Sequence, residues 1–291
     1  MAGRKLSTGQ VCEVHIFDLR DSSDTVVQTD SNRLFEAPNW TRDDQLILNG
    51  DGLLWTLPAD GSAPPSEIPL AGAPELNNDH VLAPDGRSIY LSGNDWHLYR
   101  AELTGGPVRR VSRDRGRLMH FLHGISPDGE TLAYVNVDPE GGWGSFANIH
   151  TVRVDGSDDR EVLPGAGPDD GPEYSPDGRW LYFNTERFTP GQAQIARMRP
   201  DGSGLQQLTF DDRVNWFPHS SPDGRYWVYL SYPSGTTGHP ADLPVRLCRV
   251  RDEAWTDATI VAELPGGQGT INVNSWSPDS TRFAYVSYPV G

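Results

Sequence analysis

Short apolar runs and turn-forming residues alternate along the whole chain. Runs such as SIYLS, TLAYVNV, RWLYFN, YWVYLS and RFAYVS each follow a Pro-Asp-Gly turn or a close variant of it. A short segment that in most copies ends in an apolar or aromatic residue precedes the turn. Alternation with a period of two predicts strands, and two such runs around Pro-Asp-Gly predict a β-hairpin. The periodicity of an amphipathic helix is hard to find anywhere in the sequence.

The hairpins define a repeat unit of roughly 45 residues. The aligned turn positions are Pro84, Pro127, Pro176, Pro222 and Pro278, with Arg42 at the degenerate first position. A second hairpin follows in each unit, most clearly in residues 194–210, where QIARMR and LQQLTF flank the turn PDGSG. Four strands in a unit of this length are typical of a β-propeller blade.

The two ends of the chain complement each other. Residues 11–29 resemble the third and fourth strands of a blade, and residues 271–288 resemble a first pair of strands. Together they would complete one blade, which removes the exposed sheet edges that favour aggregation. We therefore expect an all-β, six-bladed propeller with four antiparallel strands per blade, closed by both termini, and a single domain over residues 1–291.

The composition excludes several classes of protein. A formal charge of -16 argues against a nucleic-acid partner, because contacts to phosphates need a basic surface. No apolar run is long enough for a membrane span or a secretion signal, so we expect a cytoplasmic protein. No Walker loop or strand-to-helix GxGxxG motif is present, which argues against a nucleotide cofactor.

SPDG motifs that begin at Ser126, Ser175 and Ser221 resemble those of the TolB family of six-bladed propellers. The resemblance covers essentially the whole chain and implies the fold. TolB itself has a further N-terminal domain and a secretion signal, and it binds a lipoprotein partner in the periplasm; we recognise neither feature here. Similar propellers precede a serine-hydrolase domain in the prolyl oligopeptidase family, but this sequence has no GxSxG motif.

Candidate catalytic and binding residues lie in the variable segments just before the turns. In a propeller the first strand of each blade lines the central channel, so these segments should converge. We expect the following residues to be catalytic: His80, His123, His219, Asp170 and Glu173. We expect Asn78, Asp79 and Asn272 to bind substrate on the same approach. The alternative is structural, because strand starts beside a wet channel are polar in any case.

A divalent metal (Mn, Ca or Zn) is a further expectation at the channel mouth. His80, His123 and His219 would be ligands together with Glu36, since imidazole and carboxylate groups are common metal ligands. Some sugar lyases with related propellers hold a metal there with histidines and a glutamine. No HxH or HxxxH spacing supports the metal independently.

Loops on the same face add further candidates for substrate binding. The insertion from Tyr232 to Pro244 carries His239, and a glycine-rich turn carries Gln268. Trp143 could stack on a sugar ring or cover a blade edge. The loop arginines could bind an anionic group or simply pair with acidic neighbours. They are Arg113, Arg115 and Arg117.

Two functions remain open at this point. The first is an enzyme or binder for a carbohydrate or another small polar or anionic ligand in the channel, as a lyase or hydrolase if it is an enzyme. The second is a scaffold that binds a peptide or a partner domain on the same face, which would require a broad apolar patch there.

Overall fold

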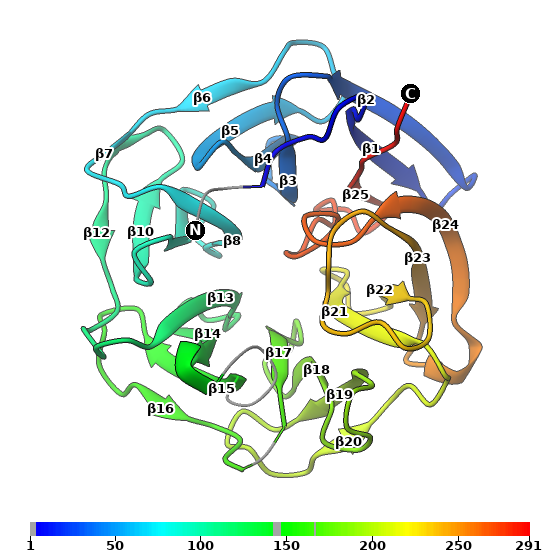
Figure 1. The fold of residues 1–291 in the computed structure, drawn as a ribbon. Coiled ribbons are helices and arrows are strands. Elements are labelled where there is room, and N and C mark those ends of the chain that lie inside the picture. Colours follow the sequence, from blue (N-terminus) through cyan, green and yellow to red (C-terminus); the bar gives the residue numbers. More distant parts are fainter. Residues whose placement is uncertain (1–3, 142–146, 166) are drawn as a thin grey trace.

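A computed structural model describes residues 4–141, 147–165 and 167–291. Six antiparallel sheets stand around a central axis like the blades of a propeller (Figure 1). This arrangement confirms the expected all-β fold with six blades. No helical segment in the described part of the chain is long and apolar enough to cross a bilayer.

Five blades run in sequence order from the channel outward. The first contains β3 (Phe35–Trp40), β4 (Gln45–Gly50), β5 (Leu53–Pro58) and β6 (Ser66–Ile68), and the second contains β8 (Leu76–Leu82), β9 (Ser88–Gly93), β10 (Leu98–Glu102) and β12 (Arg109–Arg110). The third contains β13 (Met119–Ile125), β14 (Thr131–Val137), β15 (Ala147–Arg153) and β16 (Arg160–Glu161), and the fourth contains β17 (Asp169–Tyr174), β18 (Leu181–Thr185), β19 (Gln194–Met198) and β20 (Gln206–Gln207). The fifth contains β21 (Val214–Ser220), β22 (Tyr226–Tyr232), β23 (Leu243–Arg251) and β24 (Thr259–Gly266).

The sixth blade is closed by both ends of the chain, as expected. The strand β25 (Arg282–Ser287) pairs antiparallel with β1 (Cys12–Asp18), and β1 pairs with β2 (Ser23–Asp30). The innermost segment of this blade contacts β25 through an isolated bridge between Trp276 and Phe283. Short parallel strands β7 (Leu70–Ala71) and β11 (Gly106–Pro107), and the 3-10 turns η1 (Pro139–Gly141) and η2 (Trp255–Asp257), lie outside the blades.

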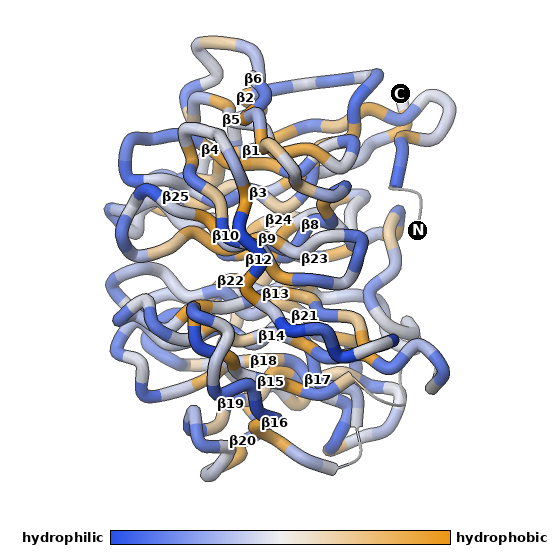
Figure 2. Tube along the Cα trace, turned by 90° about the vertical axis from the view of Figure 1, so that its left-hand side faces the viewer, coloured by the Kyte–Doolittle hydropathy of each residue, from blue (hydrophilic) through white to orange (hydrophobic). Residues whose placement is uncertain are grey.

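The core lies between neighbouring blades. Figure 2 shows apolar residues concentrated along the strands, with polar residues in the loops at their ends. One cluster joins Phe17, Trp216 and Phe283 from the fifth and sixth blades, all less than 6% exposed. Each alternating strand buries side chains on both sheet faces against neighbouring blades, so the ring is held by packing between sheets.

The innermost strand of each of the first five blades contains an irregularity in register. The irregularities fall at these positions: between Glu36 and Asn39, Leu76 and His80, Leu122 and Gly124, Asp170 and Glu173, and Trp216 and His219. At three equivalent places the backbone is left-handed, with φ of +52° at Ala37, +63° at Gly171 and +55° at Phe217. A bulge breaks the simple alternation of side chains and redirects the residues beside it.

Candidate functional site

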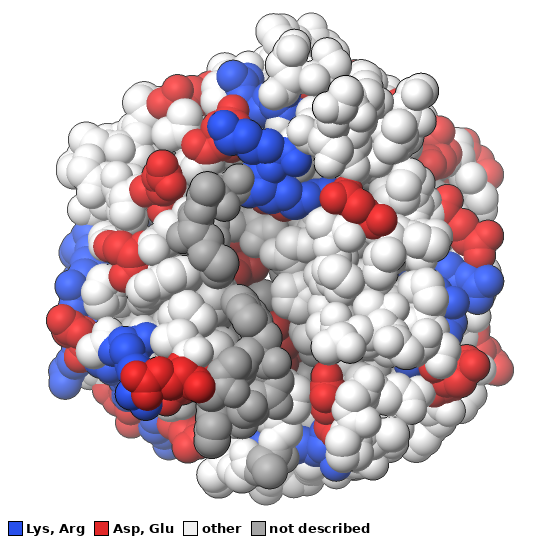
Figure 3. All heavy atoms as spheres, viewed as in Figure 1, with Lys and Arg blue, Asp and Glu red and all other residues white. Residues whose placement is uncertain are grey.

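A cavity of about 860 Å³ opens at one mouth of the channel. The bulged parts of the inner strands form its wall, together with the loop before β23, which contributes Thr237 to Ala241. Figure 3 shows the hollow at the centre of this face, with acidic side chains visible inside it. Polar side chains from different blades therefore meet around one enclosed volume.

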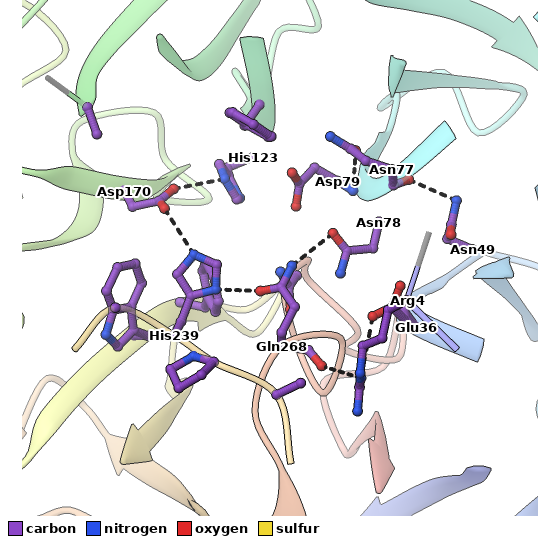
Figure 4. Close-up of a pocket in the computed structure, with 18 of the residues that line it drawn as sticks. Arg4, Glu36, Asn49, Asn77, Asn78, Asp79, His123, Asp170, His239 and Gln268 are labelled. Carbon is purple, nitrogen blue, oxygen red and sulfur yellow. Dashed lines mark hydrogen bonds and ion pairs between the residues drawn. The ribbon is translucent and has the colours of Figure 1, made fainter. Parts of the chain in front are cut away.

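A chain of polar contacts crosses this cavity (Figure 4). Nε2 of His123 lies 3.0 Å from one carboxylate oxygen of Asp170, and Nε2 of His239 lies 3.6 Å from the other. Nδ1 of His239 donates to the side-chain carbonyl of Gln268, whose amide donates to Oδ1 of Asn78 at 3.2 Å. The contacts link residues from the second, third and fourth blades and from two loops into one network.

His123 is the positively charged centre of this network. Burial alone would lower its pKa, but the nearby carboxylates of Asp79 and Asp170 outweigh that effect and raise the pKa to about 9. The same hydrogen bond and charge lower the pKa of Asp170, against the effect of its burial. Burial lowers the pKa of His239. At neutral pH the site therefore contains one imidazolium and one neutral imidazole.

Asp79 and Glu36 each have one buried oxygen without a hydrogen bond to a described residue, but only that of Glu36 has a guanidinium beside it, at 3.5 Å from Arg4. Asp79 is 5% exposed, and its Oδ1 makes no hydrogen bond to any residue that the structure describes. Burial raises its pKa to about 6, although the charge of His123 and a hydrogen bond from Asn272 oppose this change. A buried carboxylate with an unpaired oxygen is costly, and a ligand that donates to that oxygen would remove the cost.

Glu36 lies on the first blade, where Arg4 reaches into the cavity. One guanidinium nitrogen of Arg4 lies 3.5 Å from Glu36 and donates to the carbonyl of Gln268 at 2.8 Å, while another donates to Asp242 at 2.6 Å. Burial raises the pKa of Glu36 to about 7, although Arg4 opposes this shift. The pair adds little net charge to the cavity.

Aromatic rings form part of the wall. His123 stacks on Phe217 at a centroid distance of 5.7 Å, and His239 lies 4.5 Å from Trp216 and 5.1 Å from Phe217. Trp96 and Phe121 line the same cavity. A cavity with aromatic faces beside a few fixed polar groups is the usual form of a site for a small molecule.

A second hollow of about 470 Å³ opens on the opposite face, where the turn prolines lie. His123 lines both hollows, so its ring stands at the partition between the two mouths of the channel.

Comparison with known proteins shows the family. Residues 124–241 match the TolB β-propeller domain. The uncharacterized protein Atu1656 of Agrobacterium fabrum is 37% identical over 293 residues, which span 98% of this chain and 96% of that protein. The chain belongs to the TolB-like β-propeller family. A solved structure from Agrobacterium tumefaciens, assigned provisionally as TolB, has 36% identity and a TM-score of 0.88 and covers 96% of this chain and 99% of its own.

More distant structures share the fold of this TolB-like propeller. An oligogalacturonate lyase in complex with manganese is 14% identical with a TM-score of 0.57, covering 92% of this chain and 70% of that one. TolB from Acinetobacter baumannii is 16% identical with a TM-score of 0.59, covering 93% of this chain and 56% of that one. At these identities the likeness concerns the architecture alone.

Many of the residues expected from the sequence lie together in this TolB-like propeller. They are Glu36, Asn78, Asp79, His123, Asp170, His239, Gln268 and Asn272, all of which line the cavity. His120, three residues before His123, bonds instead to the backbone carbonyl of Trp96 in the neighbouring blade. Residues three apart in a strand point to opposite faces of the sheet, which accounts for the different directions of the two rings.

Other expected site residues lie in buried networks outside the cavity. The two ring nitrogens of His219 face Glu173 and the carbonyl of Ile271, both at 2.6 Å. Nδ1 of His80 bonds to Oδ1 of Asn39 at 2.8 Å, and burial lowers the pKa of His80 to about 3. Because these groups are engaged between blades, their geometry supports packing rather than contact with a ligand in the cavity.

The four expected metal ligands do not form one centre. Both nitrogens of His219 already face protein acceptors, Glu36 pairs with Arg4, and His80 does not line the cavity. Within the described ranges, no group of three or more His, Cys, Asp or Glu side chains is placed to hold a metal ion. This donor arrangement does not fit a shared divalent metal.

The expected arginines point elsewhere. Arg115 pairs with Asp159 at 2.9 Å, and Arg117 pairs with Asp138 at 2.8 Å and with a second acidic neighbour; Arg113 is exposed and, like the other two, does not line the cavity. Arg115 and Arg117 are therefore engaged by acidic neighbours away from the cavity wall. Trp143 lies outside the described residues.

Arg4 and the aromatic wall of the cavity were not expected from the sequence. Trp216 and Phe217 stand in the variable segment before a turn, which is the signal that could have identified them. Arg4 precedes the first strand, and no motif marks it.

Proposed function

We propose that this TolB-like propeller binds a carbohydrate or another small, hydroxyl-bearing ligand in the cavity and transfers protons to and from it. The observation that carries the proposal is the buried Oδ1 of Asp79, which lines the cavity without a hydrogen bond to any described residue. A ligand hydroxyl would supply the missing donor.

The rest of the wall supports this class of ligand. The amides of Asn78, Gln268 and Asn272 can both donate and accept hydrogen bonds, as hydroxyl groups require. The rings of Trp216 and Phe217 offer apolar surface for the face of a sugar. With the predicted arginines elsewhere and several carboxylates in the wall, an anionic ligand has less support than a neutral one.

The titration of the site supports acid–base chemistry. His123, with a pKa of about 9, is protonated at neutral pH and can donate a proton to a leaving oxygen. Asp79, with a pKa of about 6, is mostly ionised and can accept one. A lyase and a hydrolase both need an acid and a base within one cavity, so these are the reaction classes that we propose. Because the donor set does not fit a metal, no step is assigned to one.

The test is binding of a panel of neutral mono- and disaccharides, measured by calorimetry and by thermal shift. We expect at least one sugar to bind, and Asp79→Asn to weaken that binding about tenfold, because the amide presents a donor where the ligand needs an acceptor. The matched control is Asp51→Asn, which removes the same charge from the rim of the same cavity, where Asp51 pairs with Arg33. A panel without any binder, or equal losses in the two variants, would refute the proposal.

A protein-binding scaffold has less support. Such a function requires a broad apolar patch on the cavity face. None of the exposed large apolar side chains among the described residues lines the cavity; they are Val26, Leu53, Phe188, Phe210, Ile260 and Val290. Single exposed apolar residues are ordinary on a protein surface.

A further inference from the structure

The inner part of the cavity has an unbalanced charge. Its acidic groups are Glu36, Asp79 and Asp170, and its basic groups are Arg4 and His123, while His239 is held neutral. Arg4 is engaged by Glu36 and also by Asp242. Arg4 is thus occupied by two carboxylates, which leaves His123 as the cation that Asp79 and Asp170 share.

The unbalanced charge can be located. Asp170 is paired through one oxygen with the imidazolium of His123, at 3.0 Å. Asp79 interacts with the charge of His123, but its Oδ1 has no hydrogen-bond donor among the described residues. The missing positive charge therefore belongs beside Oδ1 of Asp79.

We infer that the ligand of this cavity carries a positively charged amine, which donates to Oδ1 of Asp79. This inference rests on the proposed function, because it names the substrate class of the same site as an amine-bearing, hydroxylated molecule such as an amino sugar.

The surroundings favour an ammonium group over a neutral hydroxyl at this position. A charge-assisted hydrogen bond to a carboxylate is stronger than a neutral one, and low dielectric increases the difference. The same wall also contains Trp96, Phe121 and Trp216, and aromatic rings are groups that attract cations.

A metal ion is the other cation to consider. Divalent metals need several oxygen or nitrogen donors around one point, whereas an ammonium group needs one to three acceptors. No group of three or more acidic, histidine or cysteine side chains is placed for a metal in the part of the chain that the structure describes. A single unpaired carboxylate oxygen is enough to bind an ammonium group but not a divalent metal ion.

The experiment compares four sugars that differ at one substituent: glucose, glucosamine, N-acetylglucosamine and glucuronic acid. We expect glucosamine to bind about tenfold to a hundredfold more tightly than glucose and N-acetylglucosamine, and glucuronic acid to bind most weakly. In Asp79→Asn the advantage of glucosamine should disappear, whereas Asp51→Asn should retain it. The advantage should also decline below about pH 6, where Asp79 becomes protonated.

The outcomes separate the inference from the proposed function. Equal binding of glucose and glucosamine would overturn the amine and leave the carbohydrate site standing. Failure of all four sugars to bind would overturn both. If Mn²⁺ or Zn²⁺ alone stabilises the protein and Asp79→Asn removes that effect, the unbalanced charge belongs to a metal and the inference is wrong. The thermal stability of Asp79→Asn without ligand, compared with that of the parent, shows that the variant is folded.

Discussion

Glu173 should contribute more to stability than its single side chain suggests. One carboxylate oxygen accepts from the backbone amide of Ser220 at 2.8 Å, from its hydroxyl at 3.1 Å and from the amide of Asn274 at 2.8 Å, and the other lies 2.6 Å from Nδ1 of His219. These contacts join the fourth blade to the fifth and to the innermost segment of the sixth. Every partner is a donor, so only a carboxylate satisfies all of them.

The substitution Glu173→Gln directs an NH₂ group at this set of donors. In either orientation the amide leaves at least one buried donor without an acceptor, which costs about 1–3 kcal/mol. Unfolding entropy of about 2.1 cal/mol/K per residue gives about 0.6 kcal/mol/K for a chain of 291 residues, so Tm should fall by about 2–5 °C. Differential scanning calorimetry at neutral pH measures this shift directly.

The control is Glu130→Gln, the same chemical change in an exposed pair with Arg153 at 2.9 Å. Exposed pairs contribute about 0–1 kcal/mol, so this variant should lose no more than about 2 °C. Equal changes of Tm in the two variants would refute the claim that Glu173 links three blades.

Two further predictions concern titration and backbone geometry. The pKa of His123 is raised in the folded protein, so its contribution to stability is complete below about pH 6.5 and is lost as the pH rises through about 9. The variant His123→Gln should therefore show a smaller decline of Tm between these two pH values. A decline equal to that of the parent protein would contradict the raised pKa. Gly202 and Gly72 have similar left-handed φ values of +85° and +77°, but a Cβ at Gly202 would lie 2.2 Å from the carbonyl of Val162 whereas one at Gly72 meets nothing within 4 Å. Gly72→Ala should therefore cost about 1–2 kcal/mol and Gly202→Ala clearly more, and equal costs in urea unfolding would count against the clash.

The blade architecture could be predicted from the sequence because it depends on local signals. The alternating runs and Pro-Asp-Gly turns specify each hairpin without reference to distant residues, and the partial blades at the ends specify the closure by β1 and β25. The variable segment before each turn also predicted His123, Asp170 and Asp79 as cavity residues, because the first strand of a blade faces the channel.

The direction of individual side chains could not be predicted in the same way. His80 and His123 occupy the same position relative to their turns, yet His123 reaches the cavity and His80 bonds to Asn39 between blades. The irregular register spans Leu76 to His80 in the second blade but is confined to His123 in the third. The position of a bulge depends on packing between blades, which a hairpin motif does not encode.

The closure of the ring has a consequence for how the protein is made. His15 of β1 bonds to Ser287 of β25 across 272 positions of sequence, so these strands can meet only after the residues between them have been synthesised. Until then the edge of β1 stays open and can pair with other nascent chains. Pairing at such separation is also slow, because the entropy of closing the loop is lost before any contact is gained. We expect chaperone dependence during synthesis to be greatest for chains that stop just short of β25.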